Sequence, residues 1–166
     1  MRVREPDVKL DEIDRRIIAI LQPDGRRPFA DIGRELGVSE GTVRQRYQRL
    51  VAQGILQVVG VADPFKIGFQ SMAMIGINVS LESGLTIDDV ANTLARFREV
   101  SYVVMSTGDF DLLVEVIVES SEDLADFLTH KLHAAPGVIR TETFVLLRVY
   151  KMSLGGWRMV EMQADQ

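Results

Sequence analysis

Hydrogen-bonding and cationic side chains are concentrated between residues 39 and 49 of the chain. In the major groove of DNA, Arg pairs bidentately with guanine and Gln with adenine, whereas phosphates accept hydrogen bonds from guanidinium and hydroxyl groups. The chemistry that this segment offers is therefore recognition of double-stranded DNA. We predict that base edges are read by Glu40, Thr42, Arg44 and Gln45, and that phosphates are contacted by Ser39, Arg46 and Arg49. The alternative is that these are ordinary solvated positions on a helix.

A second group of polar residues lies at 107–111. Gly108 and Asp109 suit a tight hairpin, a purely structural explanation in which Phe110 simply packs. The functional alternative is a binding site, because turn amides can hold a carboxylate and an Asp can hold an ammonium group, and an amino acid carries both. The predicted effector contacts are Thr107, Gly108, Asp109, Phe110, Asp111, Thr141 and Thr143, the last two from a neighbouring subunit.

No constellation of residues in the sequence points to catalysis or to a metal. The chain has no Cys, and its two histidines are His130 and His133. Their spacing on a helix suits a metal, yet zinc sites need three or four protein ligands. We therefore expect no cofactor, no metal and no enzymatic activity. The rival hypotheses are an enzyme on the same fold and a metabolite-binding oligomer that does not bind DNA.

The charges are distributed unevenly along the 166 residues. The net charge is −5, but residues 1–54 carry 11 bases and 9 acids, whereas the remainder carries 8 bases and 15 acids. The first part is therefore positive by 2 and the second negative by 7. Such asymmetry is expected when one part of a chain meets polyanionic DNA and the other does not. With 46% hydrophobic and 26% charged residues, the composition is that of a globular protein.

Three helices are predicted in the first third of the chain. Asp11 precedes a helical pattern that ends before Pro23, and a second helix has Pro28 in its first turn and Gly37 at its end. Ser39 is the expected N-cap of a third helix that runs to about residue 53. A Gly-containing turn between the second and third helices is typical of a helix-turn-helix. The inner side of the third helix is expected to carry Val43, Tyr47, Leu50 and Val51.

The rest of the chain predicts a connection and a second, α+β module. Residues 55–69 contain short apolar runs that suggest short strands, with a break at Gly60 and a turn at Asp63-Pro64. Then follow strand, helix, strand, strand, helix and strand, at residues 72–79, 86–97, 100–107, 111–118, 121–135 and 138–150. This βαββαβ order predicts a ferredoxin-like domain, with an antiparallel sheet and both helices on one face.

Two of the predicted strands are apolar on both faces. On the first strand Ala73, Ile75 and Ile77 alternate with methionines, and on the third Leu112, Val114 and Val116 alternate with Leu113 and Ile117. Helices cover only one face of such a sheet, so the other is expected to be buried against a second copy of the chain. The sequence therefore predicts a homodimer.

These features together resemble the Lrp/AsnC family of leucine-responsive and asparagine-responsive regulators. The N-terminal resemblance is carried by Leu10, Asp11, Asp14, residues 17–21, Gly25, Arg26, residues 29–32, residues 36–39, Val43, Arg46, Arg49, Leu50, Gly54 and Ile55. The C-terminal resemblance is carried by residues 107–111, Pro136, Gly137, Val138, Thr141, Thr143 and Lys151. It covers residues 9–152 and implies a transcriptional regulator, dimers that assemble into octamers or related rings, and an amino-acid effector bound between C-terminal domains.

The predicted organisation is a helix-turn-helix domain at residues 1–54, a connection at 55–69, a ferredoxin-like domain at 70–152 and a tail at 153–166. No apolar run approaches the roughly 18 residues needed to span a bilayer, and the N-terminus lacks the apolar core of a signal peptide. We therefore expect a cytoplasmic protein without a membrane partner. A two-fold dimer would read a pseudo-palindromic operator, with half-sites about 10 base pairs or a multiple of one helical turn apart.

Overall fold

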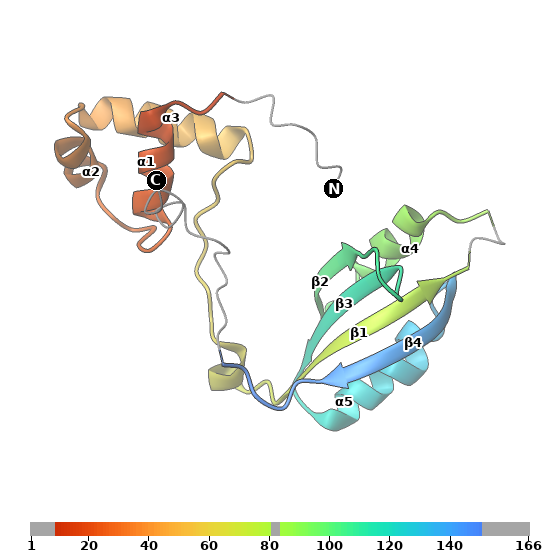
Figure 1. Cartoon of the computed structure of the whole chain (residues 1–166). Coiled ribbons are helices and arrows are strands. Elements are labelled where there is room, and N and C mark those ends of the chain that lie inside the picture. Colours follow the sequence, from red (N-terminus) through yellow and green to blue (C-terminus); the bar gives the residue numbers. More distant parts are fainter. Residues whose placement is uncertain (1–8, 81–83, 151–166) are drawn as a thin grey trace. The chain divides into compact units, whose positions relative to one another are not determined.

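The computed structural model describes residues 9–80 and 84–150 (Figure 1). Residues 9–61 belong to one compact unit, which we call the head, and residues 62–150 belong to a second, which we call the sheet domain. The head contains the predicted helix-turn-helix and the sheet domain the predicted ferredoxin-like fold, so the α+β fold class is confirmed.

The head consists of α1 (Glu12–Leu21), α2 (Phe29–Leu36) and α3 (Glu40–Ala52). Asp11 forms a capping box with Asp14 at the start of α1, and the Ser39 hydroxyl accepts the Thr42 N–H at the start of α3. Gly37 ends α2 with a left-handed φ of 69°, which favours glycine. Pro28 is the N-cap of α2, one position before the predicted first turn. The buried core is Ile17, Ile18, Leu21, Ile32, Val43, Leu50 and Leu56.

The end of the head differs from the prediction in two respects. Val51, expected on the inner side of α3, is 41% exposed, because it lies about 100° around the helix from the buried Leu50. The short strands expected after residue 55 are absent from this part of the described chain: Leu56 packs in the head core, and Val58 and Val59 are exposed. A strand needs a hydrogen-bonded neighbour, and no described segment pairs with these residues.

The sheet domain follows the predicted βαββαβ order. It contains η1 (Pro64–Ile67), which Asp63 caps at the predicted turn, then β1 (Ser71–Val79), α4 (Ile87–Leu94), β2 (Val100–Met105), β3 (Leu112–Val118), α5 (Ser121–Asp126), η2 (Phe127–Leu132) and β4 (Val138–Val145). The strands lie in the order β2-β3-β1-β4, and every neighbouring pair is antiparallel. Both α4 and α5 lie on the same side of the sheet (Figure 1). The ferredoxin-like prediction is therefore confirmed.

Four elements end earlier than predicted. The helix predicted at residues 86–97 stops at Leu94. β4 stops at Val145 instead of residue 150, because β1 begins at Ser71 and its last hydrogen bond to this edge is the one that the Leu146 N–H donates to the Met72 carbonyl over 2.8 Å. β2 stops at Met105, where the N–H of Ser106 donates to the Asp111 carbonyl over 2.9 Å and closes the hairpin. The helix predicted to end at residue 135 changes after Asp126 into the π-helical η2. Within the described ranges, no helix is both long and apolar enough to cross a membrane.

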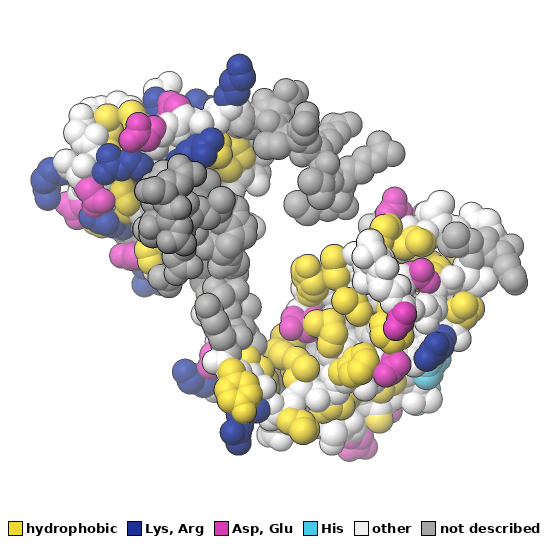
Figure 2. Space-filling model, viewed as in Figure 1, with side chains coloured by type: hydrophobic (Ala, Val, Ile, Leu, Met, Phe, Trp, Pro, Cys, Tyr) yellow, Lys and Arg dark blue, Asp and Glu magenta, His cyan; other side chains and the backbone are white. Residues whose placement is uncertain are grey.

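The two faces of the sheet differ in what covers them. Alternate residues of β1 and β3, such as Ile75 and Val114, are buried with Leu94 and Phe127 from the helical side. The other face, which we call the open face, carries Met72, Met74, Gly76 and Asn78 of β1 beside Leu113, Glu115 and Ile117 of β3. Figure 2 shows hydrophobic side chains spread over this face with acidic and basic ones among them. Apolar residues thus occur on both faces, as predicted, together with charges that the alternation did not indicate.

Candidate nucleic-acid interface and effector turn

A close approach of backbones sets the position of α3 relative to α2. A side chain at Gly33 would meet the Val38 carbonyl oxygen at 2.7 Å, so only glycine allows α2 to pack this tightly against the turn. Gly37 then supplies the left-handed residue, and Ser39 starts the next helix. Sequence reasoning missed Gly33, although a glycine inside a short helical pattern is a signal for close packing.

The predicted reading side of α3 faces away from the head core. Val43 and Leu50 have no exposed surface. Among the predicted contacts, the exposed ones are Ser39, Glu40, Arg44, Gln45 and Arg49, and the half-buried ones are Thr42 and Arg46. The chemistry of this side is thus guanidinium, amide and hydroxyl groups with one carboxylate.

Two of the predicted base-reading side chains bind each other in the head. Nη2 of Arg44 lies 2.5 Å from Oε1 of Glu40, one helical turn away, and the Arg44 guanidinium lies 5.5 Å from the centre of the Phe29 ring. Phe29 in turn contacts Tyr47, with ring centres 5.0 Å apart. Arg44 is therefore aligned along α3 by an ion pair and a ring, and four of its five guanidinium N–H groups remain for other acceptors.

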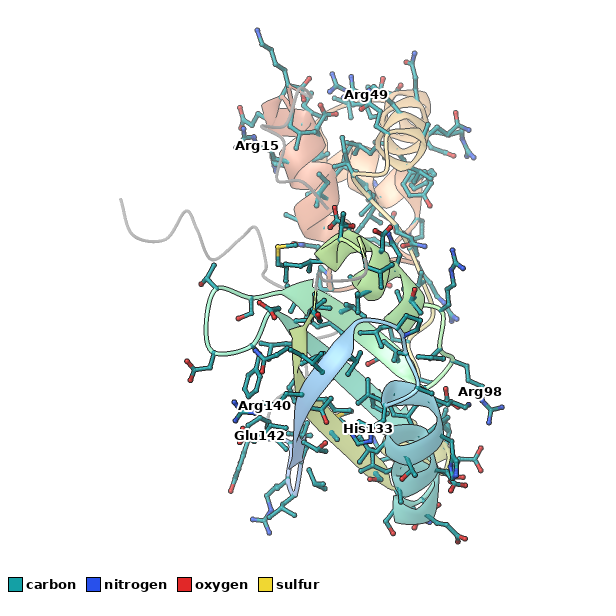
Figure 3. All side chains as sticks on the ribbon, turned by 90° about the vertical axis from the view of Figure 1, so that its right-hand side faces the viewer. Arg15, Arg49, Arg98, His133, Arg140 and Glu142 are labelled. Atoms are coloured by element: carbon teal, nitrogen blue, oxygen red, sulfur yellow. The ribbon has the colours of Figure 1, made fainter. Side chains whose placement is uncertain are left out.

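The arginines Arg46 and Arg49 are anchored by α1. Asp14 is fully buried, and its two carboxylate oxygens accept from Nη1 of Arg46 at 2.9 Å and from Nη2 of Arg49 at 2.5 Å. The side chain of Arg46 is only 23% exposed, whereas that of Arg49 is 45% exposed and lies where α1 and α3 meet (Figure 3). We call this group the arginine clamp. Because a buried carboxylate is costly without partners, the clamp fixes α3 to α1.

Sequence reasoning did not identify Asp14 as part of this group, although a signal was present. Asp14 lies three and four positions before Ile17 and Ile18, so it shares the buried side of α1. An acid on a buried helical stripe requires a cationic partner, and Arg46 and Arg49 are the partners.

Asp11 extends the clamp to the solvent. Its carboxylate accepts from Nη1 of Arg46 over 2.5 Å and also caps the N–H of Asp14. The hydrogen bond from Arg46, followed by the one from the Asp14 backbone, lowers the pKa of Asp11 from 3.8 to about 2. The Asp11 carboxylate is therefore charged at any pH where the protein meets DNA.

The predicted effector turn is held against the end of β1. The N–H of Asp111 donates to the Ile77 carbonyl over 3.0 Å, and the Asp111 carboxylate accepts the N–H of Val79 over 2.8 Å. Inside the turn, the Gly108 N–H donates to the Ser106 hydroxyl over 3.2 Å. Thr107, Gly108 and Asp109 are exposed, so part of the turn is open to a ligand while Asp111 is engaged by the strand.

The structure separates Thr141 and Thr143 from Phe110 within one chain. The two threonines pair with Ile77 and Ile75 and so share the helix-covered face, whereas Phe110 lies over Gly76 on the open face. The Thr141 hydroxyl lies 3.1 Å from Nε2 of His133 at the end of η2. In Figure 3, His133 lies on the side of β4 toward α5, and Arg140 and Glu142 lie on the other side. One chain therefore does not bring all the predicted effector residues together.

Two family models match the chain, and they divide it as the structure does. The AsnC-type helix-turn-helix domain matches residues 10–51, and the Lrp/AsnC ligand binding domain matches residues 72–155. The first match contains α1, α2 and all but the last residue of α3, and the second begins in β1.

Individual relatives and solved structures agree with these models. An uncharacterized HTH-type transcriptional regulator of Pyrococcus furiosus is 38% identical over 143 residues, which are 86% of this chain and 95% of that protein. The crystal structure of the leucine response regulatory protein of Mycobacterium tuberculosis is 26% identical, covers 87% of this chain and 97% of its own, and gives a TM-score of 0.77. A transcriptional regulator of Neisseria meningitidis, solved as a complex with L-Met, is 21% identical with a TM-score of 0.77 over 89% of this chain and 96% of its own. The chain therefore belongs to the Lrp/AsnC family of transcriptional regulators, which are not enzymes.

Proposed function

We propose that this regulator binds a pseudo-palindromic operator as a homodimer, with α3 of each head in a major groove. The observation that carries the proposal is the outward position of Arg44, Gln45 and Arg49 on a helix whose Val43 and Leu50 are completely buried. In a helix-turn-helix, the second helix of the motif, which is α3 here, presents its N-terminal residues to base edges. This side of α3 offers the donors and acceptors that such an edge requires.

The individual contacts follow from position along α3. Gln45 and Arg44 reach adenine and guanine, and Thr42 and Glu40 lie beside them nearer to the start of the helix. The start of α3, with Ser39, and the half-exposed Arg49 contact phosphates. Arg46 is less exposed than Arg44, Gln45 and Arg49, and its Nη1 binds Asp11 and Asp14. Its phosphate contact is therefore made by the guanidinium nitrogens that these two acids do not bind.

The dimer uses the open face of the sheet. Partly exposed Leu113 and Ile117 and the 45% exposed Phe144 form an apolar surface that water contacts in an isolated chain. Two copies related by a two-fold axis bury this surface and present two heads to successive turns of DNA, about 10 base pairs or a multiple apart. Our proposal includes association of these dimers into octamers and a place in the cytoplasm, which the resemblance to the family suggests.

The effector is an amino acid bound at residues 107–111, with Thr141 and Thr143 contributed by a neighbouring subunit. Support comes from the exposure of residues Gly108 and Asp109, from the match to a ligand binding domain, and from the Neisseria meningitidis regulator solved with L-Met. Turn amides suit the carboxylate, and the Asp109 carboxylate suits the ammonium group. Binding shifts the population of assemblies and so alters the spacing of the heads along an operator.

The test is selection of binding sequences from a pool of random double-stranded DNA, followed by titration of the selected duplex. We expect an inverted repeat with half-site centres about 10 base pairs or a multiple apart. Changing Arg44 and Gln45 to Ala lowers affinity for the selected site by about 10- to 100-fold, with a smaller loss on unrelated DNA.

Arg98→Ala is the matched control, since it removes the same charge from a side chain that is 90% exposed in the sheet domain. Its affinity stays at the wild-type value. Selection that returns no common sequence, or equal losses for the α3 double variant and the control, contradicts the proposal.

A further inference from the structure

Gly76 is a glycine in the middle of a sheet, where a side chain would normally contribute packing. It lies on the open face of β1, opposite Leu113 of β3 and Glu142 of β4. A Cβ at this position would overlap the ring of Phe110, whose Cε2 would lie only 2.6 Å away. The missing side chain therefore leaves the space in which the Phe110 ring lies flat against the strand.

Asn78, the next open-face residue of β1, holds the effector turn, and its side chain binds the backbone of that turn. Its Nδ2 donates to the Asp109 carbonyl over 2.8 Å, across 31 positions of sequence. Its Oδ1 is buried and, among the residues that the structure describes, has no hydrogen-bond partner. A buried acceptor without a partner lowers stability. Among the described residues, the hydrogen bond that the structure shows for this side chain is thus the one to the turn.

Phe110 continues from the turn onto the open face. Its ring meets Phe144 of β4 edge-on, with ring centres 6.4 Å apart. The turn is therefore fixed at three points by residues outside it: Phe110 on Gly76, the Asp109 carbonyl on Asn78, and Asp111 on the backbone of Ile77 and Val79.

We infer that Gly76 and Asn78 are positioning residues of the effector turn, which seat Phe110 and the Asp109 carbonyl so that the amides of residues 107–109 have one conformation. The inference rests on the proposed effector site for its functional meaning. A preformed turn binds its ligand without first ordering itself, so loss of the seat lowers ligand affinity without removing any ligand contact.

The first test needs no ligand. Hydrogen exchange is measured at the amides of Asp111 and Val79 in the full chain, for wild type, Gly76→Ala and Asn78→Ala. We expect faster exchange by about tenfold or more in Gly76→Ala, from overpacking, and by about fivefold in Asn78→Ala, from one lost hydrogen bond. Gly60→Ala is the control, because Gly60 has open space around its Cα and no left-handed φ. Unchanged exchange in both variants overturns the inference.

A double-mutant cycle separates the Phe110 seat from a general effect of the added methyl group. Gly76→Ala is introduced into wild type and into Phe110→Ala, and the denaturant midpoint is measured for all four proteins. We expect a clear loss in the wild-type background and little change once the ring is absent. An equal loss of the denaturant midpoint in both backgrounds means that the glycine at position 76 is not needed to accommodate the Phe110 ring. That result overturns the inference for Gly76.

The ligand arm uses the twenty L-amino acids in thermal-shift titrations. If one binds wild type, its affinity is expected to fall about tenfold in Gly76→Ala, with the Gly60→Ala control unchanged. Equal affinity in Gly76→Ala, despite faster exchange of the turn, overturns the positioning role. If none of the twenty binds wild type, the proposed effector fails, and the exchange measurement still decides whether Gly76 and Asn78 position the turn.

Discussion

The reading side of α3 and the effector turn are both small polar surfaces, but they are built in different ways. The first is assembled inside one compact head, where Asp14 binds Arg46 and Arg49, and the Phe29 ring lies against the Arg44 guanidinium. In the second, residues of β1 hold the turn, and the predicted threonines lie on the opposite face of the sheet from Phe110. The head of a single chain therefore carries all of the predicted DNA contacts, whereas its effector turn holds only part of the predicted ligand contacts.

Removing the buried acid of the arginine clamp should have the largest effect on the head. Asp14→Ala leaves Arg46 and Arg49 without their shared partner, and loss of one member of a buried ion pair costs about 3–5 kcal/mol. The arginines retain some contact with water, so we expect a loss of about 2–4 kcal/mol in the free energy of unfolding of the head, measured by urea titration. Glu12→Ala, an exposed acid in the same turn, should change it by less than about 0.5 kcal/mol. Similar values for both variants would show that the clamp does not hold α3.

A charge on the open face of the sheet, where the effector turn also lies, tests whether this face is the dimer interface. Leu113→Asp places a carboxylate where the proposed dimer buries apolar surface, and the dissociation constant of the dimer should rise by about 10- to 100-fold in sedimentation experiments. Ala125→Asp puts the same charge on the exposed side of α5 and should leave association unchanged. If Leu113→Asp associates as tightly as wild type, the open face is not the dimer interface.

The two arginines of the clamp should differ in their contribution to DNA binding. Arg49→Gln removes a cation that is 45% exposed, so the slope of log affinity against log salt should fall by about 0.9 for each half-site. Arg46→Gln removes a guanidinium that is 23% exposed and shared by two carboxylates, so the slope should change less. Equal changes in slope would mean that exposure in the free head does not predict phosphate contact.

The smallest expected effect is an acid dependence of the head. The pKa of Asp11 is lowered to about 2, so its contribution to stability is complete above its ordinary value of 3.8 and disappears as the pH falls through 2. Asp11→Asn should therefore remove part of the acid destabilisation between about pH 4 and pH 2, as followed by helical circular dichroism. A pH profile identical to that of wild type would contradict the Asp11–Arg46 contact.

Local patterns made most of the head predictable. The caps at Asp11 and Ser39 and the left-handed Gly37 each depend on neighbouring residues, and the structure contains all three. The partner of Asp14 was not predictable in the same way, because Arg46 is 32 positions away and only the packing of α1 on α3 brings them together.

In the sheet domain, the strand order followed from the pattern of elements, but the surroundings of the turn did not. Alternation placed Gly76 on the open face, yet nothing in the local sequence indicated that Phe110 would fill the space above it. Likewise, β4 could not be seen to end at Val145 until its register with β1 was known. Contacts between elements, which local periodicity does not encode, account for these differences.

Methylation interference on the selected duplex tests most directly whether α3 lies in the major groove. Dimethyl sulfate modifies guanine N7 in the major groove and adenine N3 in the minor groove. We expect methylated guanines to block binding in two tracts whose centres lie about 10 base pairs or a multiple apart, with the tracts lost in the Arg44 and Gln45 double variant. Interference confined to adenines, or none at all, would contradict the proposed role of α3.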